Sequence, residues 1–67
     1  MRQRIYNFYV LSHRFDGHGR GFAVGFDSEK AAHVFANYCL FGWAYVQADW
    51  QVERNFPEWY QSRVTGA

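Results

Sequence analysis

The chain has 67 residues, a formal net charge of +1 and one cysteine. This length allows a single domain over residues 1–67, and so short a chain buries only about 60% of its unfolded surface. One cysteine excludes an internal disulfide, so the fold depends on dense packing or self-association. Fifteen residues are Phe, Tyr or Trp. Because a monomer of this size cannot easily hide them all, we expect surface aromatics and a tendency to form a homodimer.

The charges are distributed unevenly. Residues 1–20 carry four arginines and one aspartate, whereas residues 21–67 carry three basic and five acidic side chains. The N-terminal third is therefore basic and rich in Arg, which favours planar and stacked contacts. No apolar run approaches the roughly 20 residues of a membrane span, and the N-terminus lacks a signal-peptide pattern. We expect no membrane partner and, with a lone thiol, a cytoplasmic location.

Residues 4–15 predict a first strand, because aromatic and β-branched residues dominate them. Both faces of this strand are apolar, which favours a central strand or an exposed binding face. The sequence DGHG at residues 16–19 predicts a hairpin turn, since glycine accepts positive φ without steric cost.

Residues 20–26 predict a second strand with two distinct faces. One face carries Phe22, Val24 and Phe26, which we expect to form core beneath a helix. The other face carries the small residues Ala23 and Gly25, where a helix or a partner's backbone could approach closely.

A helix is predicted from the cap residue Ser28 to about Leu40, ended by Gly42. Its spacing predicts a buried stripe of Ala32, Phe35, Ala36, Cys39 and Leu40. Outside that stripe, either thickening it or facing a partner, lie Val34, Tyr38 and Phe41.

Residues 44–53 alternate between apolar and polar side chains and predict a third strand with a solvated polar face. Residues 54–56 predict a turn. Pro57 suits the first position of a short helix that would turn Trp59, Tyr60 and Val64 inward, with an edge strand over residues 58–64 as the alternative. The fold class is therefore α+β: a small antiparallel sheet in β-β-α-β order, with one helix packed on one face and a fourth strand or short helix at the C-terminus.

Residues 20–26, of sequence RGFAVGF, resemble the RNP1 motif of RNA-recognition motif domains. The next residues, 28–32, resemble the helix after that motif, and residues 9–11 resemble the second RNP strand. The resemblance implies RNA binding by aromatic side chains that stack on bases across an open sheet. The aromatic expected between Ala23 and Val24 is missing, however, and the two strands stand too close in sequence for that family's first crossover helix. We therefore assign no family from it.

No catalytic, cofactor or metal site is predicted. The glycine-rich residues 17–21 lie between two strands and lack the helix N-terminus that completes a phosphate site. The spacing of His13, His18, His33 and Cys39 matches no standard zinc site. A chain of this length also has little room for a ligand pocket of some 300–1,000 Å³, so we do not expect an enzyme.

These observations favour a non-enzymatic protein-binding module that acts by occluding a partner's surface. By analogy of type alone, it looks like small phage or mobile-element proteins that inhibit host machinery, including anti-CRISPR proteins, and its expected partner is a host macromolecular complex. One alternative is a small nucleic-acid-binding protein that uses the basic hairpin and stacking aromatics; another is a structural subunit of a permanent oligomer. The candidate partner-binding residues are Tyr6, Tyr9, Arg14, His18 and Arg20, followed by the tail aromatics Trp59 and Tyr60, which we expect to be exposed.

Overall fold

Three strands and three helices make up the fold of this protein in a computed structural model, which describes residues 6–39 and 43–65. In chain order the elements are β1 (Phe8–Ser12), β2 (Ala23–Phe26), α1 (Glu29–Cys39), β3 (Ala44–Ala48), α2 (Asp49–Asn55) and α3 (Pro57–Thr65).

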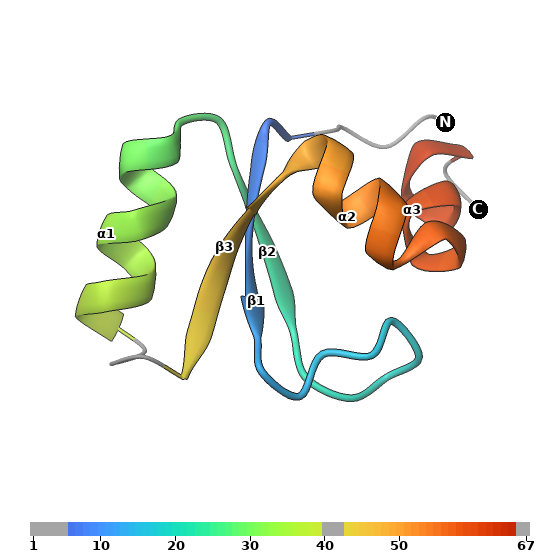
Figure 1. Ribbon diagram of the computed structural model, residues 1–67, viewed down its shortest axis with the longest axis horizontal. Coiled ribbons are helices and arrows are strands. Elements are labelled where there is room, and N and C mark those ends of the chain that lie inside the picture. The colour runs from blue at the N-terminus through green and yellow to red at the C-terminus, as the bar shows by residue number, and fades with distance from the viewer. Residues whose placement is uncertain (1–5, 40–42, 66–67) are drawn as a thin grey trace.

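The strands form one antiparallel sheet in the order β2-β1-β3 (Figure 1). Val10 of β1 faces Val24 on one side and Val46 on the other. Because β2 and β3 are both antiparallel to β1, they run parallel to each other, and α1 is the crossover between them. The predicted α+β class is confirmed, and the apolar first strand is the central one.

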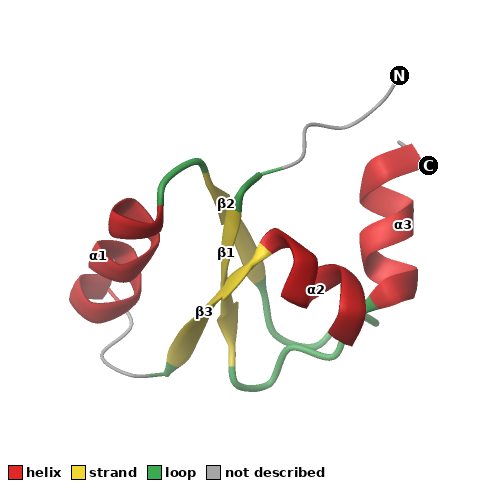
Figure 2. Cartoon of the chain, turned by 45° about the horizontal axis from the view of Figure 1, so that its top comes forward, coloured by secondary structure: helices red, strands yellow, loops and turns green. Residues whose placement is uncertain are grey.

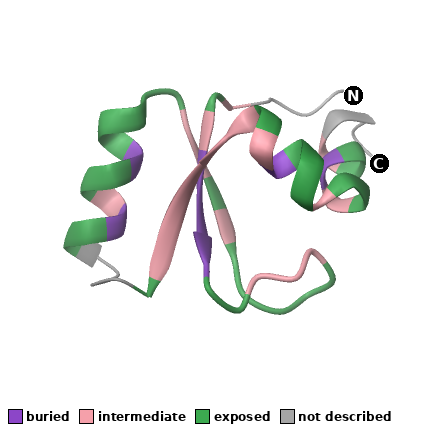
Figure 3. Cartoon of the chain, viewed as in Figure 1, coloured by how far each residue is buried: buried purple, intermediate pink, exposed green. Residues whose placement is uncertain are grey.

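Helices cover both faces of the sheet (Figures 1 and 2). Side chains of β1 alternate between the two faces, so that Val10 packs with Ala32 and Ala36 of α1. Leu11 points the other way, into a cluster with Val52 of α2. The two apolar faces of the first strand are therefore explained by a three-layer arrangement, in which the C-terminal helices cover the face opposite α1. Figure 3 shows the buried centre of β1 between these layers.

The prediction of a strand over residues 44–53 is wrong beyond Ala48, where α2 begins. Ala48 stands opposite Phe8, the first residue of β1, so the ladder has no partner strand to extend along. The chain instead turns into a helix, whose first turn is secured when the Ala48 N–H donates to Gln51 Oε1 at 2.9 Å. The expected turn at 54–56 is therefore wrong for residues 54 and 55, which belong to α2, and only Phe56 separates α2 from α3. The polar face of β3 is also not solvated, because Tyr45 packs against the cluster beneath α2 and α3.

Two helix predictions are confirmed. Ser28 caps α1, since its hydroxyl accepts a hydrogen bond from the Ala31 N–H at 3.1 Å. Helix α3 begins at Pro57, so the edge-strand alternative for residues 58–64 is wrong. Ala32 and Ala36 are buried as expected, and Phe35 is half-buried against the same cluster. The predictions for Leu40, Phe41 and the helix end at Gly42 fall on residues outside the described ranges, and the side chains of Cys39 and Val64 are also not described.

Strand β2 is shorter than predicted and only partly covered. It begins at Ala23, and Phe26 contacts Phe35 of α1 with ring centroids 5.2 Å apart. Phe22 and Val24 remain 38% and 37% exposed, because α1 packs mainly on β1 and β3. The expectation that all three of these apolar residues form core beneath the helix is therefore correct for Phe26 alone. On the opposite face, the ring of Tyr6 lies directly over Gly25, where a side chain would overlap it.

Candidate partner-binding surface

Four of the aromatic residues proposed for partner binding belong to the core beneath α2 and α3. Tyr9 is 2% and Tyr60 7% exposed, and Trp59 lies edge-on to Tyr9 with ring centroids 5.8 Å apart. Tyr6 is half-buried against the same cluster. The expectation that Trp59 and Tyr60 are exposed is wrong, because the sheet and the two C-terminal helices enclose them. In this fold Tyr9 and Tyr60 present no side-chain surface to a partner.

The hydroxyls in this core are satisfied internally. Tyr60 donates to both carboxylate oxygens of Asp49 at 2.9 Å. Burial and then this hydrogen bond to a carboxylate raise the pKa of Tyr60 to about 12. The Tyr9 hydroxyl accepts from the Tyr6 N–H at 3.3 Å, and burial raises its pKa as well. The cluster therefore stabilises the fold.

The other three predicted residues, Arg14, His18 and Arg20, are exposed in the loop between β1 and β2. Asp16 orders this loop, because its Oδ1 accepts from the His18 N–H at 2.7 Å and from the Arg20 N–H at 3.1 Å. These two backbone hydrogen bonds hold the pKa of the Asp16 carboxyl below its usual value. The predicted turn is thus a polar loop of defined shape, and it presents basic side chains on its surface.

A groove of about 390 Å³ lies where β1 ends and where β2 and β3 begin. Its described lining, which we call the sheet-end groove, consists of Ser12, His13, Arg14, Gly21, Phe22 and Trp43. The volume falls in the lower part of the range for ligand pockets, so the expectation that the chain has little room for one is wrong.

Backbone hydrogen bonds hold the walls of the sheet-end groove in place. The Ser12 N–H donates to the Phe22 carbonyl at 3.0 Å, and the Phe22 N–H returns a bond to Ser12 Oγ at 3.0 Å. The His13 N–H donates to the Trp43 carbonyl at 3.1 Å. Both aromatic walls are therefore tied to the central strand.

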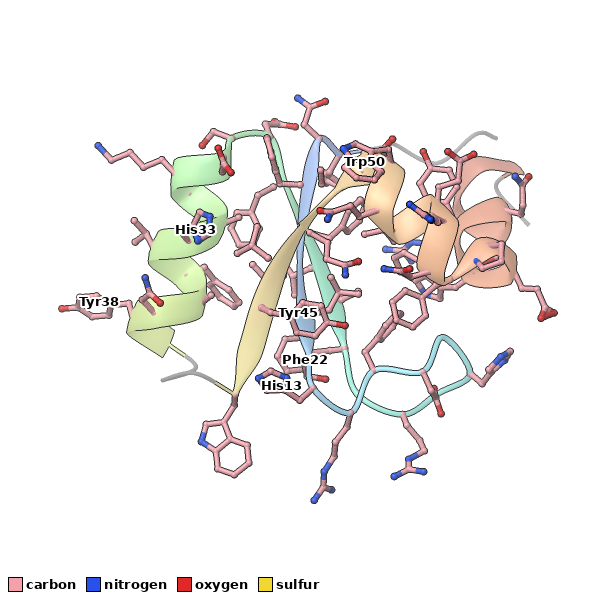
Figure 4. All side chains as sticks on the ribbon, in the orientation of Figure 1. His13, Phe22, His33, Tyr38, Tyr45 and Trp50 are labelled. Carbon is pink, nitrogen blue, oxygen red and sulfur yellow. The ribbon has the colours of Figure 1, made fainter. Side chains whose placement is uncertain are left out.

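The chemistry of this groove is aromatic and basic. Trp43 is 73% exposed, and Arg14 carries the only fixed charge among its described lining residues. His13 packs on Tyr45 with ring centroids 5.4 Å apart, at the same end of the sheet as Phe22 (Figure 4). Such a site suits an apolar or aromatic group that carries a negative charge beside it.

A second hollow, of about 230 Å³, lies between the β1–β2 loop and the α2–α3 junction. Asp16, His18, Asn55 and Glu58 contribute polar groups to it, and Trp59 contributes to its wall. Among the described residues, no group of three or more His, Cys, Asp or Glu side chains is arranged to hold a metal ion. Unlike the sheet-end groove, this hollow has no exposed Phe, Tyr or Trp side chain among its described lining residues, because Phe56 and Trp59 are both half-buried. We therefore favour the sheet-end groove as the candidate site.

The sequence identified only part of this surface. Arg14 is among the residues predicted from the sequence, whereas Phe22 is predicted as core and Trp43 is not among the predicted residues. Val34 and Tyr38, predicted either to thicken the buried stripe of α1 or to face a partner, are 53% and 80% exposed, so they do not thicken it.

Comparisons with protein-family models, with curated proteins and with solved structures find no match to this chain. No helix within the described residues is long and apolar enough to cross a membrane.

Proposed function

We propose that this chain is a non-enzymatic protein-binding module that acts by covering a partner's surface, and that the sheet-end groove is its binding site. The observation that carries the proposal is Trp43, a large aromatic side chain that stays 73% exposed while its backbone is hydrogen-bonded to the central strand. Tryptophan and arginine are over-represented among the residues that dominate binding energy, and here both line one groove.

The groove indicates the chemistry of the partner. Phe22 and Trp43 provide apolar walls for an anchoring apolar or aromatic side chain, and Arg14 provides a charge for a neighbouring carboxylate. A protein of this size that binds one surface tightly excludes other partners from it. Inhibition of a host macromolecular complex, as by small phage or mobile-element inhibitors, is the form of activity that we propose.

Two tryptophans provide a matched experiment. The tagged chain is incubated with nuclease-treated extract of the host cells, and retained proteins are quantified by mass spectrometry. Trp43→Ala should weaken capture of the specific partner at least about 30-fold, the equivalent of about 2 kcal/mol for a central interface aromatic. Trp50→Ala, which truncates a 59% exposed tryptophan outside the groove, should leave capture unchanged. Equal capture by both variants would contradict the proposal.

The second candidate function is binding of single-stranded nucleic acid, favoured by the presence of aromatic rings and Arg14 in one groove. It is tested with fluorescently labelled single-stranded DNA and RNA at several salt concentrations. Nucleic-acid binding should weaken steeply with salt and should depend on Arg14 and Arg20 together. Loss of the captured partner on nuclease treatment would favour this second function over the first.

A further inference from the structure

Strand β2 is an edge strand of the sheet, and two of its residues point their backbone N–H and C=O groups away from the neighbouring strand β1. The Ser12 N–H donates to the Phe22 carbonyl, so this pair is a hydrogen-bonded one. Such pairs alternate along an antiparallel ladder, so Val24 and Phe26 also bond to β1. The N–H and C=O groups of Ala23 and Gly25 therefore point outward from the edge.

This edge strand is short, but it lacks two other features that usually prevent strand pairing. Its four residues, of sequence AVGF, include no charge and no proline. Val24 is 37% exposed at the middle of the strand. The outward groups of Ala23 and Gly25 stand on either side of Val24, so the edge is symmetric about that residue.

Helix α1 leaves this edge partly uncovered. Phe35 contacts Phe26, which shows that one side of α1 faces β2. Tyr38 does not belong to that side, because at about 100° per residue it lies about 160° round the helix from the buried Ala36 and points away from the sheet (Figure 4). The apolar surface at the edge is therefore that of Phe22 and Val24.

We propose that the β2 edge pairs with the β2 edge of a second copy of this chain, antiparallel and about a two-fold axis through Val24. Ala23 of each copy then exchanges both backbone hydrogen bonds with Gly25 of the other. The two Val24 residues form a non-hydrogen-bonded pair with their Cα atoms about 4.5 Å apart. The result is one continuous sheet built from both copies, with the two α1 helices on the same face.

The symmetry of the edge favours a second copy over an unrelated strand. Pairing about Val24 is the register that satisfies Ala23 and Gly25 in both chains without using residues outside β2. On the α1 face it also places each Phe22 opposite the Phe26 of the second copy. Isologous contacts require this kind of self-complementary surface.

The first test is sedimentation velocity over a range of micromolar concentrations. The wild-type chain should pass from monomer to dimer. Val24→Lys should remain monomeric, because it brings two like charges face to face, whereas Val24→Thr should still dimerise. Hydrogen exchange of the wild type gives a measurement that needs no variant: the Ala23 and Gly25 amides should become protected as concentration rises. A wild-type chain that is monomeric throughout would overturn the proposal.

The second test is of the register. In a Cys39→Ser background, Val24→Cys should form a covalent dimer on mild oxidation, since the expected Cα separation lies within the disulfide range of about 4.4–6.8 Å. Trp50→Cys in the same background should not cross-link at the same concentration. A dimer that persists in Val24→Lys and fails to cross-link through Val24→Cys would place the interface elsewhere and refute this edge pairing. Phe22 belongs both to the groove and to this pairing, whereas Trp43 belongs to the groove alone. Trp43→Ala should therefore leave dimerisation intact, so that failure of the groove function can be distinguished from failure of the dimer.

Discussion

The Tyr60 hydroxyl and the Asp49 carboxylate link two helices at the scale of single residues. Tyr60 belongs to α3 and Asp49 is the first residue of α2, so their hydrogen bonds join the start of α2 to α3. A hydrogen bond to a charged group contributes about 1.5–3 kcal/mol. Removing this hydrogen bond should therefore destabilise the whole cluster that contains Tyr9 and Val52.

This contact predicts a loss of stability in alkali. Folding raises the pKa of Tyr60 from its ordinary value of 10.0 to about 12. Between these values the unfolded chain has released the proton that the folded chain still holds, so the free energy of unfolding falls as pH rises. Below pH 10.0 the contribution of this group is fully present. Urea unfolding across this range should show the decline.

Tyr60→Phe separates this effect from other titrations. The variant should be less stable than the wild type near neutral pH, because it loses the bond to Asp49, but its stability should decline less steeply in alkali. Tyr38→Phe, which alters a tyrosine on the exposed side of α1, should retain the wild-type decline. Parallel pH profiles for the wild type and Tyr60→Phe would show that Tyr60 is not responsible.

Residue types alone do not reveal which aromatics are buried. Tyr9 and Phe22 both lie in strand-like sequence, yet Tyr9 is enclosed and Phe22 is exposed. The difference arises because α3 packs over the Tyr9 face, whereas α1 packs mainly on β1 and β3 and leaves Phe22 partly uncovered. Neither the position of α3 on the sheet nor the sideways placement of α1 is encoded in local periodicity, so the aromatic groove could not be predicted from the sequence.

At the scale of elements, α1 depends on its cap. The Ser28 hydroxyl satisfies one of the free N–H groups of the first turn, so Ser28→Ala should lower the free energy of unfolding by about 1 kcal/mol. Ser28→Asp should preserve stability, because its carboxylate can accept the same bond and interacts favourably with the helix N-terminus. Chemical denaturation followed by circular dichroism measures both. An alanine variant as stable as the wild type would show that tertiary packing alone sets the start of the helix.

The start of α1 was predictable because cap, acid and apolar stripe are consecutive signals in one segment. Helix α2 was not, because residues 44–53 alternate as a strand does. There the length of β3 depends on where β1 begins, because Ala48 pairs with Phe8, the first residue of β1. After the ladder ends, local hydrogen bonds such as that from Ala48 to Gln51 favour the helix. An element's end can thus be set by a distant strand.

At the scale of the whole molecule, β1 contributes buried residues to both hydrophobic clusters, and neither β2 nor β3 contributes a buried residue to either of them. Val10 belongs to the cluster under α1, and its neighbour Leu11 belongs to the cluster under α2 and α3. Neither cluster can lose β1 without exposing the other. A chain of this length is stable by roughly 3–10 kcal/mol, so we expect the two layers to unfold together as one cooperative unit.

Truncation on either face of β1 tests this expectation. Leu11→Ala should cost about 2–5 kcal/mol, because the side chain is fully buried. It should lower the unfolding midpoint of α1 as much as that of α2 and α3, although Leu11 does not belong to the cluster under α1. Residue-resolved hydrogen exchange in urea measures each helix separately. If the amides of α1 keep their wild-type protection in Leu11→Ala while those of α3 lose it, the two layers are independent, and the central strand does not couple them.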